Sequence, residues 1–113
     1  MAITLDVTEH AGFPVLAIGG ELNGQDDDRL VAEVGELLQK SGDRLILDLA
    51  GLAFLNSTGL GTLVRVNAQA NVQEQRVVLA RPSAVVDGVL RTTQLIKFFE
   101  THDTLEQAAV AIR

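Results

Sequence analysis

The chain has 113 residues, which is the size of one ordinary domain, so we expect a single domain over residues 1–113. It contains no cysteine, which excludes disulfides, thiolate metal ligands and cysteine nucleophiles. The formal net charge is −6 and no tryptophan or tyrosine is present, so the basic surface and stacking aromatics of a nucleic-acid-binding protein are missing. There is no basic leader, and no segment is apolar over the thickness of a bilayer. We therefore expect a cytoplasmic protein that binds neither nucleic acid nor a membrane.

The negative charge is concentrated in the first half of the chain, and the second half is nearly balanced. An acidic surface commonly keeps a protein soluble. It can also face a basic patch on a protein partner, and the sequence leaves both interpretations open.

The first part of the chain predicts a hairpin and then a helix. "ITLDVTE" (3–9) alternates apolar and polar residues, and "VLAIGG" (15–20) is a second strand, with "AGFP" supplying the turn between them. A turn at Asn23-Gly24 then leads into an amphipathic helix from about Asp26 to Gln39.

Three consecutive aspartates, Asp26, Asp27 and Asp28, fall at the expected start of that helix. Carboxylates there complement the partial positive charge of a helix N-terminus. A divalent metal site is the alternative, but the glycine and distal glutamate of a calcium loop are missing. We therefore favour a helix start and expect no metal site.

The rest of the chain reads as strands that alternate with helices. In chain order we expect one strand over "RLILDLAGLAFL" (44–55), a helix from about Leu60 to Asn71, a strand at "RVVLA" (76–80), a helix after Pro82, a short strand at "LIKFF" (95–99) and a last helix capped by Thr104. Strands and helices in this order imply an α/β fold, with a mixed sheet of about four to five strands and about four helices packed against it.

The segment "FLNSTGLG" (54–61) stands where the central strand ends and a helix begins. Asn56 or Ser57 can cap that helix, whose free N–H groups make a natural anion site. Gly59 and Gly61 leave the surface uncluttered, so that a partner could approach closely. Capping alone would explain part of this segment, but one cap needs fewer hydroxyl and amide groups than are present.

Known catalytic and nucleotide-binding motifs do not fit this segment. No lysine follows it, as a P-loop requires, and the spacing of the glycines matches neither a dinucleotide fingerprint nor a nucleophile elbow. The two histidines, His10 and His102, have no recognisable catalytic partner. We therefore expect neither enzymatic activity nor a cofactor.

Three segments together resemble one known family. "LILDLAGLAFLNSTGLGTLVRVNAQA" is similar to the signature of STAS domains, and specifically of bacterial anti-sigma factor antagonists, in which an apolar strand is followed by Asp-Ser-Ser/Thr-Gly-Leu and a helix. "IGGELN" resembles the family's Gly-Glu-Leu-Asp, and "LRTTQLIKFFETHDTLEQAA" resembles its C-terminal part. The resemblance covers essentially the whole chain and implies a single STAS domain.

The resemblance also implies a function. Members bind an anti-sigma factor that is a serine kinase, which frees the sigma factor. The kinase phosphorylates one serine and so ends the binding, and a phosphatase reverses this. In this chain that serine is Ser57, with Thr58 as a second, less favoured hydroxyl. The implied partner-binding residues are Asn23, Asn56, Ser57, Thr58, Gly59, Leu60 and Gly61.

The chain departs from the family pattern at two positions, because Asn23 and Asn56 stand where aspartates are usual. Each amide has the shape of the carboxylate without its charge. A member that binds a partner without regulation by phosphate is therefore an alternative, as is a STAS module of another signalling assembly. A small-ligand or nucleotide-binding module that uses the same helix N-terminus is a further alternative.

Overall fold

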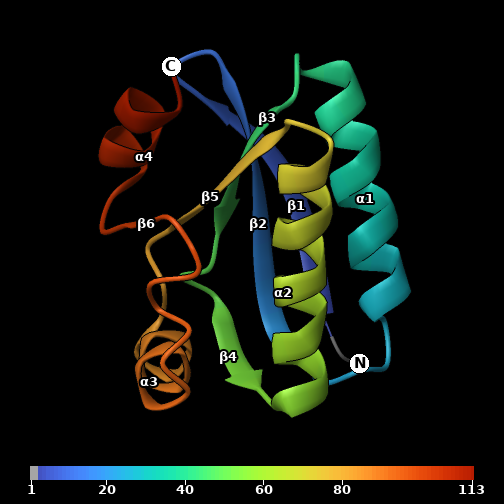
Figure 1. Cartoon of the computed structure of the whole chain (residues 1–113), viewed down its shortest axis with the longest axis vertical. Coiled ribbons are helices and arrows are strands. Elements are labelled where there is room, and N and C mark those ends of the chain that lie inside the picture. The colour runs from blue at the N-terminus through green and yellow to red at the C-terminus, as the bar shows by residue number, and fades with distance from the viewer. Residues whose placement is uncertain (1–2) are drawn as a thin grey trace.

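Residues 3–113 are described by a computed structural model, and they form one six-stranded sheet with four helices (Figure 1). The strands are β1 (Ile3–His10), β2 (Phe13–Leu22), β3 (Arg44–Asp48), β4 (Leu52–Leu55), β5 (Arg76–Ala80) and β6 (Thr101–His102). The helices are α1 (Asp27–Lys40), α2 (Ser57–Val72), α3 (Ala84–Thr92) and α4 (Leu105–Ile112). The strand order is β1-β2-β3-β5-β6, with β4 paired to β2, so the predicted α/β class is confirmed.

The predicted hairpin is confirmed. β1 and β2 are antiparallel and their last pair is His10 with Phe13, which leaves a two-residue turn. Ala11 and Gly12 both have positive φ, 53° and 87°, as the tight turns that match strand twist require. All other strand pairs are parallel.

The expectation of one strand over residues 44–55 is wrong, because the segment forms two strands. The backbone N–H of Ala50 donates to the carboxylate of Asp48 at 3.1 Å, which closes a turn after β3. Gly51 then lies against Gly19, and its carbonyl accepts from the N–H of Gly20 at 3.0 Å. The chain re-enters the sheet as β4 beside the end of β2, so the residue after β4 lies next to the residue after β2.

The expected strand at residues 95–99 is also wrong. The N–H groups of Leu95 and Ile96 both donate to the carbonyl of Leu90. The chain therefore turns back on the end of α3 and does not extend as a strand. Phe99 is buried and meets the ring of Phe98 edge to face at 5.1 Å. Phe99 therefore enters the core while Leu95 and Ile96 pack against it and Phe98 stays exposed, and the last strand, β6, follows.

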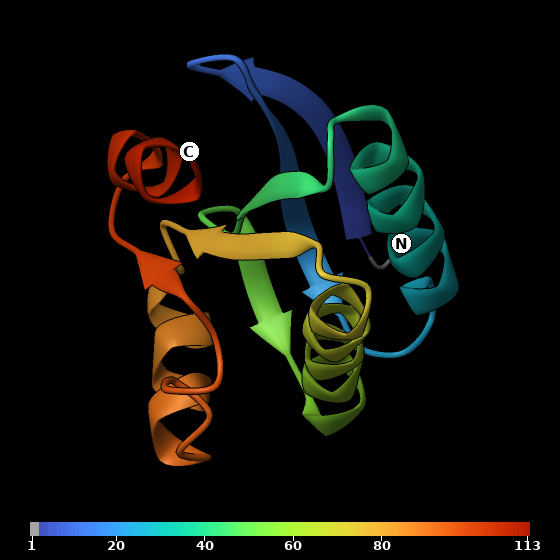
Figure 2. The same cartoon turned by 45° about the horizontal axis from the view of Figure 1, so that its top comes forward.

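The helices divide between the two faces of the sheet (Figure 2). α1 and α2 cover one face, α4 covers part of the other, and α3 packs beside β4. The larger cluster is built of leucine and valine, and the smaller one beneath α4 includes Ala108 and Ala109. α1 and α4 begin within a residue of their predicted positions, and Thr104 caps α4 by accepting from the N–H of Gln107 at 3.0 Å. α2 begins one turn earlier than predicted, at Ser57.

Candidate functional site

Ser57 is the first residue of α2, and its side chain is exposed. Its hydroxyl makes no hydrogen bond to any residue of the described range 3–113. A free hydroxyl on an exposed first turn is accessible to the active site of another protein. Thr58 is exposed as well, so both hydroxyls predicted for this surface lie on it.

Asn56 is the cap of α2, which decides between the two capping residues that the sequence left open. Its Oδ1 accepts from the N–H of Gly59 at 2.9 Å. Its Nδ2 donates to the backbone carbonyl of Asn23 at 3.2 Å, so one side chain joins the two segments that leave β2 and β4. The predicted neighbours Asn23 and Asn56 are therefore in direct contact.

The turn after β2 fits closely against the first turn of α2. The carboxamide of Asn23 accepts from the N–H of Gln25 at 3.1 Å. Gly24 has φ +105°, and a Cβ there would lie 2.9 Å from the Cγ2 methyl of Thr58. Both facts make glycine the residue that suits this position, because it tolerates positive φ and leaves room for Thr58.

Asp27 is a buried carboxylate that the sequence analysis assigned to a helix start in preference to a metal site. It is the first residue of α1 and is only 6% exposed. One oxygen accepts from the N–H of Gly24 at 2.9 Å, and the other accepts from the hydroxyl of Thr62 on α2. The one signal in the sequence is Thr62 itself, a hydroxyl one turn after Thr58 beside the apolar stripe of α2.

Gly59 and Leu60 do not form the open surface expected of them, because both are buried. A Cβ on Gly59 would lie 2.0 Å from the carbonyl oxygen of Leu22, so this glycine lets α2 pack against β2. Leu60 belongs to the core cluster. Gly61 is exposed with open space around it, as expected. The available surface is therefore Asn23, the exposed part of Asn56, Ser57, Thr58 and Gly61.

A second polar group lies at the carboxyl ends of β3 and β5, and no pattern in the sequence indicated it. Asp48 is 6% exposed and accepts from Nε of Arg81 at 3.1 Å and also from its Nη2. That hydrogen bond, followed by the carboxylate's charge, raises the pKa of Arg81. Arg81 has φ +51° and is about half exposed. The charges of Asp48 and Arg81 are thus paired with each other, whereas the hydroxyl of Ser57 is free within the described range.

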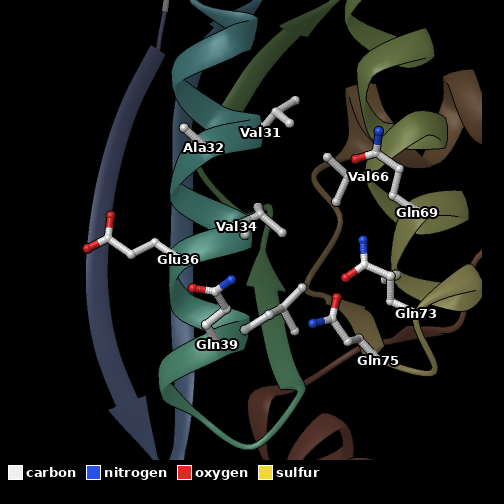
Figure 3. A pocket seen from close by; sticks show the side chains of 12 residues that line it. Val31, Ala32, Val34, Glu36, Gln39, Val66, Gln69, Gln73 and Gln75 are labelled. Carbon is white, nitrogen blue, oxygen red and sulfur yellow. The ribbon is translucent and has the colours of Figure 1, made fainter.

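A groove of about 350 Å³ lies between α1 and the C-terminal half of α2, more than two turns along the helix from Ser57 (Figure 3). Its floor includes Val34 and Val66, and its rim carries the carboxamides of Gln39, Gln69, Gln73 and Gln75. Glu36 points away from the groove and pairs with Lys40 at 2.9 Å.

Within residues 3–113 no three histidine, aspartate or glutamate side chains are grouped as metal ligands. None of the helices in that range combines the length and apolar character that a bilayer crossing needs.

Comparison with known proteins identifies the family of this chain. The model of the STAS domain family matches residues 4–108. The chain belongs to the STAS domain family. The anti-sigma-F factor antagonist RsfB of Mycobacterium tuberculosis is 31% identical to this STAS domain over 112 residues, which are 99% of this chain and 91% of the relative.

Solved structures agree with the fold of this STAS domain. The crystal structure of an anti-sigma factor antagonist from Mycobacterium paratuberculosis matches with a TM-score of 0.83 and 27% identity, over 99% of this chain and 95% of that one. The Bacillus cell fate determinant SpoIIAA in its phosphorylated form matches with a TM-score of 0.68 and 21% identity, over 99% and 100% of the two chains.

Proposed function

We propose that this STAS domain is an anti-sigma factor antagonist. It binds an anti-sigma factor with serine kinase activity and thereby releases a sigma factor. Phosphorylation of Ser57 by that kinase ends the binding, and a phosphatase acting on phospho-Ser57 restores it. The observation that carries this proposal is the exposed, unpaired hydroxyl of Ser57 at the first turn of α2. The names of the M. tuberculosis and M. paratuberculosis relatives support it.

Ser57 is a suitable position for a phosphate as far as the domain itself is concerned. A phosphate adds about −1.5 to −2 charges and three strong acceptor oxygens. At the first residue of a helix this charge meets free N–H groups and the positive end of the helix dipole. Asn56 caps the helix through a neutral amide, so no carboxylate stands at the adjacent position. The fold should therefore tolerate the modification.

A protein packed over the same surface would not tolerate it. The partner would have to remove water from a phosphate that it cannot neutralise, and the phosphate would also fill space above Thr58 and Gly61. A loss of only ~3 kcal/mol would weaken the binding more than a hundredfold. The switch then works by local charge and bulk, and no change of fold is needed.

The first test is phosphorylation itself. Incubation with the cognate anti-sigma kinase and ATP should add one phosphate, and peptide mass spectrometry should locate it at Ser57. Ser57→Ala should stay unmodified and still bind the anti-sigma factor, whereas Thr58→Ala should be modified like the wild type. An unchanged intact mass in the wild type would contradict the phosphate switch. Normal binding of Ser57→Glu to the anti-sigma factor would show that the docking surface lies elsewhere.

A further inference from the structure

The side chain of Asn56 joins two segments that are 33 residues apart in the sequence. Its oxygen holds the first turn of α2 and its nitrogen holds the backbone of the turn after β2, at 2.9 Å and 3.2 Å. We propose that Asn56 is a positioning residue whose amide fixes the turn Asn23–Asp26 against α2. The turn and Ser57 then form one preassembled docking surface. Only this last consequence rests on the proposed function.

The amide is required for this contact, and a carboxylate of the same shape cannot replace it. The group that faces Nδ2 is a backbone carbonyl, which only accepts hydrogen bonds. An ionised carboxylate has no proton to donate, so Asn56→Asp would place two oxygens against each other at this position. The helix cap would survive, because either oxygen of a carboxylate can accept from the N–H of Gly59. The substitution therefore keeps the helix cap and removes the hydrogen bond to the carbonyl of Asn23.

The remaining contacts of the turn explain why this link matters. Gly24 lies against the methyl of Thr58, and its N–H donates to Asp27, which in turn is bonded to Thr62. The peptide group between Asn23 and Gly24 is thus held at both of its polar atoms, because its N–H donates to Asp27 and its carbonyl accepts from Asn56. Without the amide, this peptide group is held by its N–H alone and opens more readily. A partner that binds both segments would then have to order the turn on binding.

The test uses the isolated protein and needs no partner. Amide hydrogen exchange of Gly24 and Gln25, corrected for intrinsic rates, reports the opening of the turn. At about pH 6, above the ordinary pKa of an aspartate, Asn56→Asp should exchange these two amides about fivefold faster than the wild type. The denaturation midpoint should stay nearly unchanged. Equal exchange in the two proteins would overturn the proposal.

A pH profile separates the link from a general structural effect. A carboxylate at a helix N-terminus ionises more readily than a free one, so the introduced carboxyl is protonated only well below its ordinary pKa of about 3.9. There it can donate to the carbonyl of Asn23, and the difference from the wild type should shrink. Asn71→Asp is the matched control, because Asn71 is an exposed residue of the same helix and the change in charge is identical. It should leave exchange in the turn unchanged at every pH. A difference that persists at low pH, or that Asn71→Asp reproduces, would contradict the assignment.

Asn56→Ser provides a second variant if Asn56→Asp does not fold. A serine keeps a cap acceptor for Gly59, but its hydroxyl is too short to span to the carbonyl of Asn23, so the turn should again exchange faster at every pH. Unchanged exchange in this variant would also overturn the proposal. Binding to the anti-sigma factor is measured last, where Asn56→Asp should bind about fivefold more weakly than Asn71→Asp. If neither the wild type nor the variants bind that partner, the proposed function fails while the exchange result still decides the role of Asn56.

Discussion

Two polar regions of the molecule are held together by different chemistry. The start of α2 is held by neutral groups, namely the amide of Asn56, backbone N–H groups and the hydroxyl of Thr62, with Asp27 as the only buried charge. The charged edge, which we define as Asp48, Arg76, Arg81, Glu100 and His102, is held by ion pairs. In the first region the hydroxyl of Ser57 stays free, whereas in the second the charged groups satisfy one another.

This difference distinguishes the proposed binding surface from a region whose polar groups hold the fold together. Carboxyl ends of parallel strands are favoured functional positions, so position alone would favour the pair of Asp48 and Arg81 as much as the start of α2. Arg81 even has the strained backbone that often marks functional sites, with φ +51°. Its guanidinium is nevertheless committed to Asp48, and Glu100 accepts from both Arg76 and His102. The start of α2, where the hydroxyl of Ser57 has no partner among the described residues, is therefore the region that we propose for modification.

The largest expected effect concerns Gly59, on the neutral side. Gly59→Ala should destabilise the fold by about 3 kcal/mol, because the new methyl would meet the backbone of Leu22 and α2 would have to move away from β2. Gly61→Ala is the matched control, since open space surrounds that position. It should stabilise the fold by about 0.5–1 kcal/mol through helix propensity. Urea denaturation measures both, and equal stabilities would show that α2 does not pack against β2 through this glycine.

The next effect concerns the ion pair of the charged edge. Arg81→Ala should cost about 1–2 kcal/mol, because it leaves the buried carboxylate of Asp48 with the N–H of Ala50 as its remaining partner. The cost stays moderate because the arginine side of the pair is about half exposed. Arg81→Gly removes the same ion pair but accepts a positive φ freely. It should therefore be about 1 kcal/mol more stable than Arg81→Ala by thermal or urea unfolding. If the two variants unfold alike, the backbone at residue 81 is not strained.

The smallest effect tests the pH dependence of the charged edge. Burial alone would raise the pKa of Glu100, but hydrogen bonds from His102 and Arg76, together with their charges, lower it from its ordinary value of 4.5. The stability gained from this carboxylate is therefore full above about pH 4.5 and is lost as the pH falls through the lowered pKa of the folded state.

Glu100→Gln should thus cost about 0.5–1 kcal/mol at neutral pH, since the pair is partly exposed, and the difference from the wild type should vanish on acidification. Urea unfolding between neutral pH and about pH 3 checks this sign. A difference that grows on acidification would contradict it.

Local patterns predicted most of the fold, and tertiary contacts decided the remainder. The hairpin, α1 and the capped α4 follow from alternation, helical spacing and a cap residue. The division of residues 44–55 into β3 and β4 depends on Asp48 closing a turn and on the contact of Gly51 with Gly19, and neither is visible in a run of leucines. Residues 95–99 look like a strand because a loop that packs Leu95, Ile96 and Phe99 against the core can be as apolar as a buried strand.

The sequence indicated which residues lie near one another at the candidate site, but not that two of them face the core. Asn23, Asn56, Ser57 and Thr58 lie together as expected. Placing the start of α2 at Leu60 hid the fact that a helix beginning at Ser57 turns Gly59 and Leu60 toward the sheet. The link from Asp27 to Thr62 joins two helices, and no pattern within one element can reveal such a contact.

The most direct measurement compares the protein bearing phosphoserine at position 57 with the unmodified protein, in calorimetric titrations against the anti-sigma factor. Affinity should fall more than a hundredfold while the unfolding midpoint stays the same, because the charge acts on the partner and the fold is unchanged. Equal affinities, or a loss of affinity that appears only together with unfolding, would contradict the account.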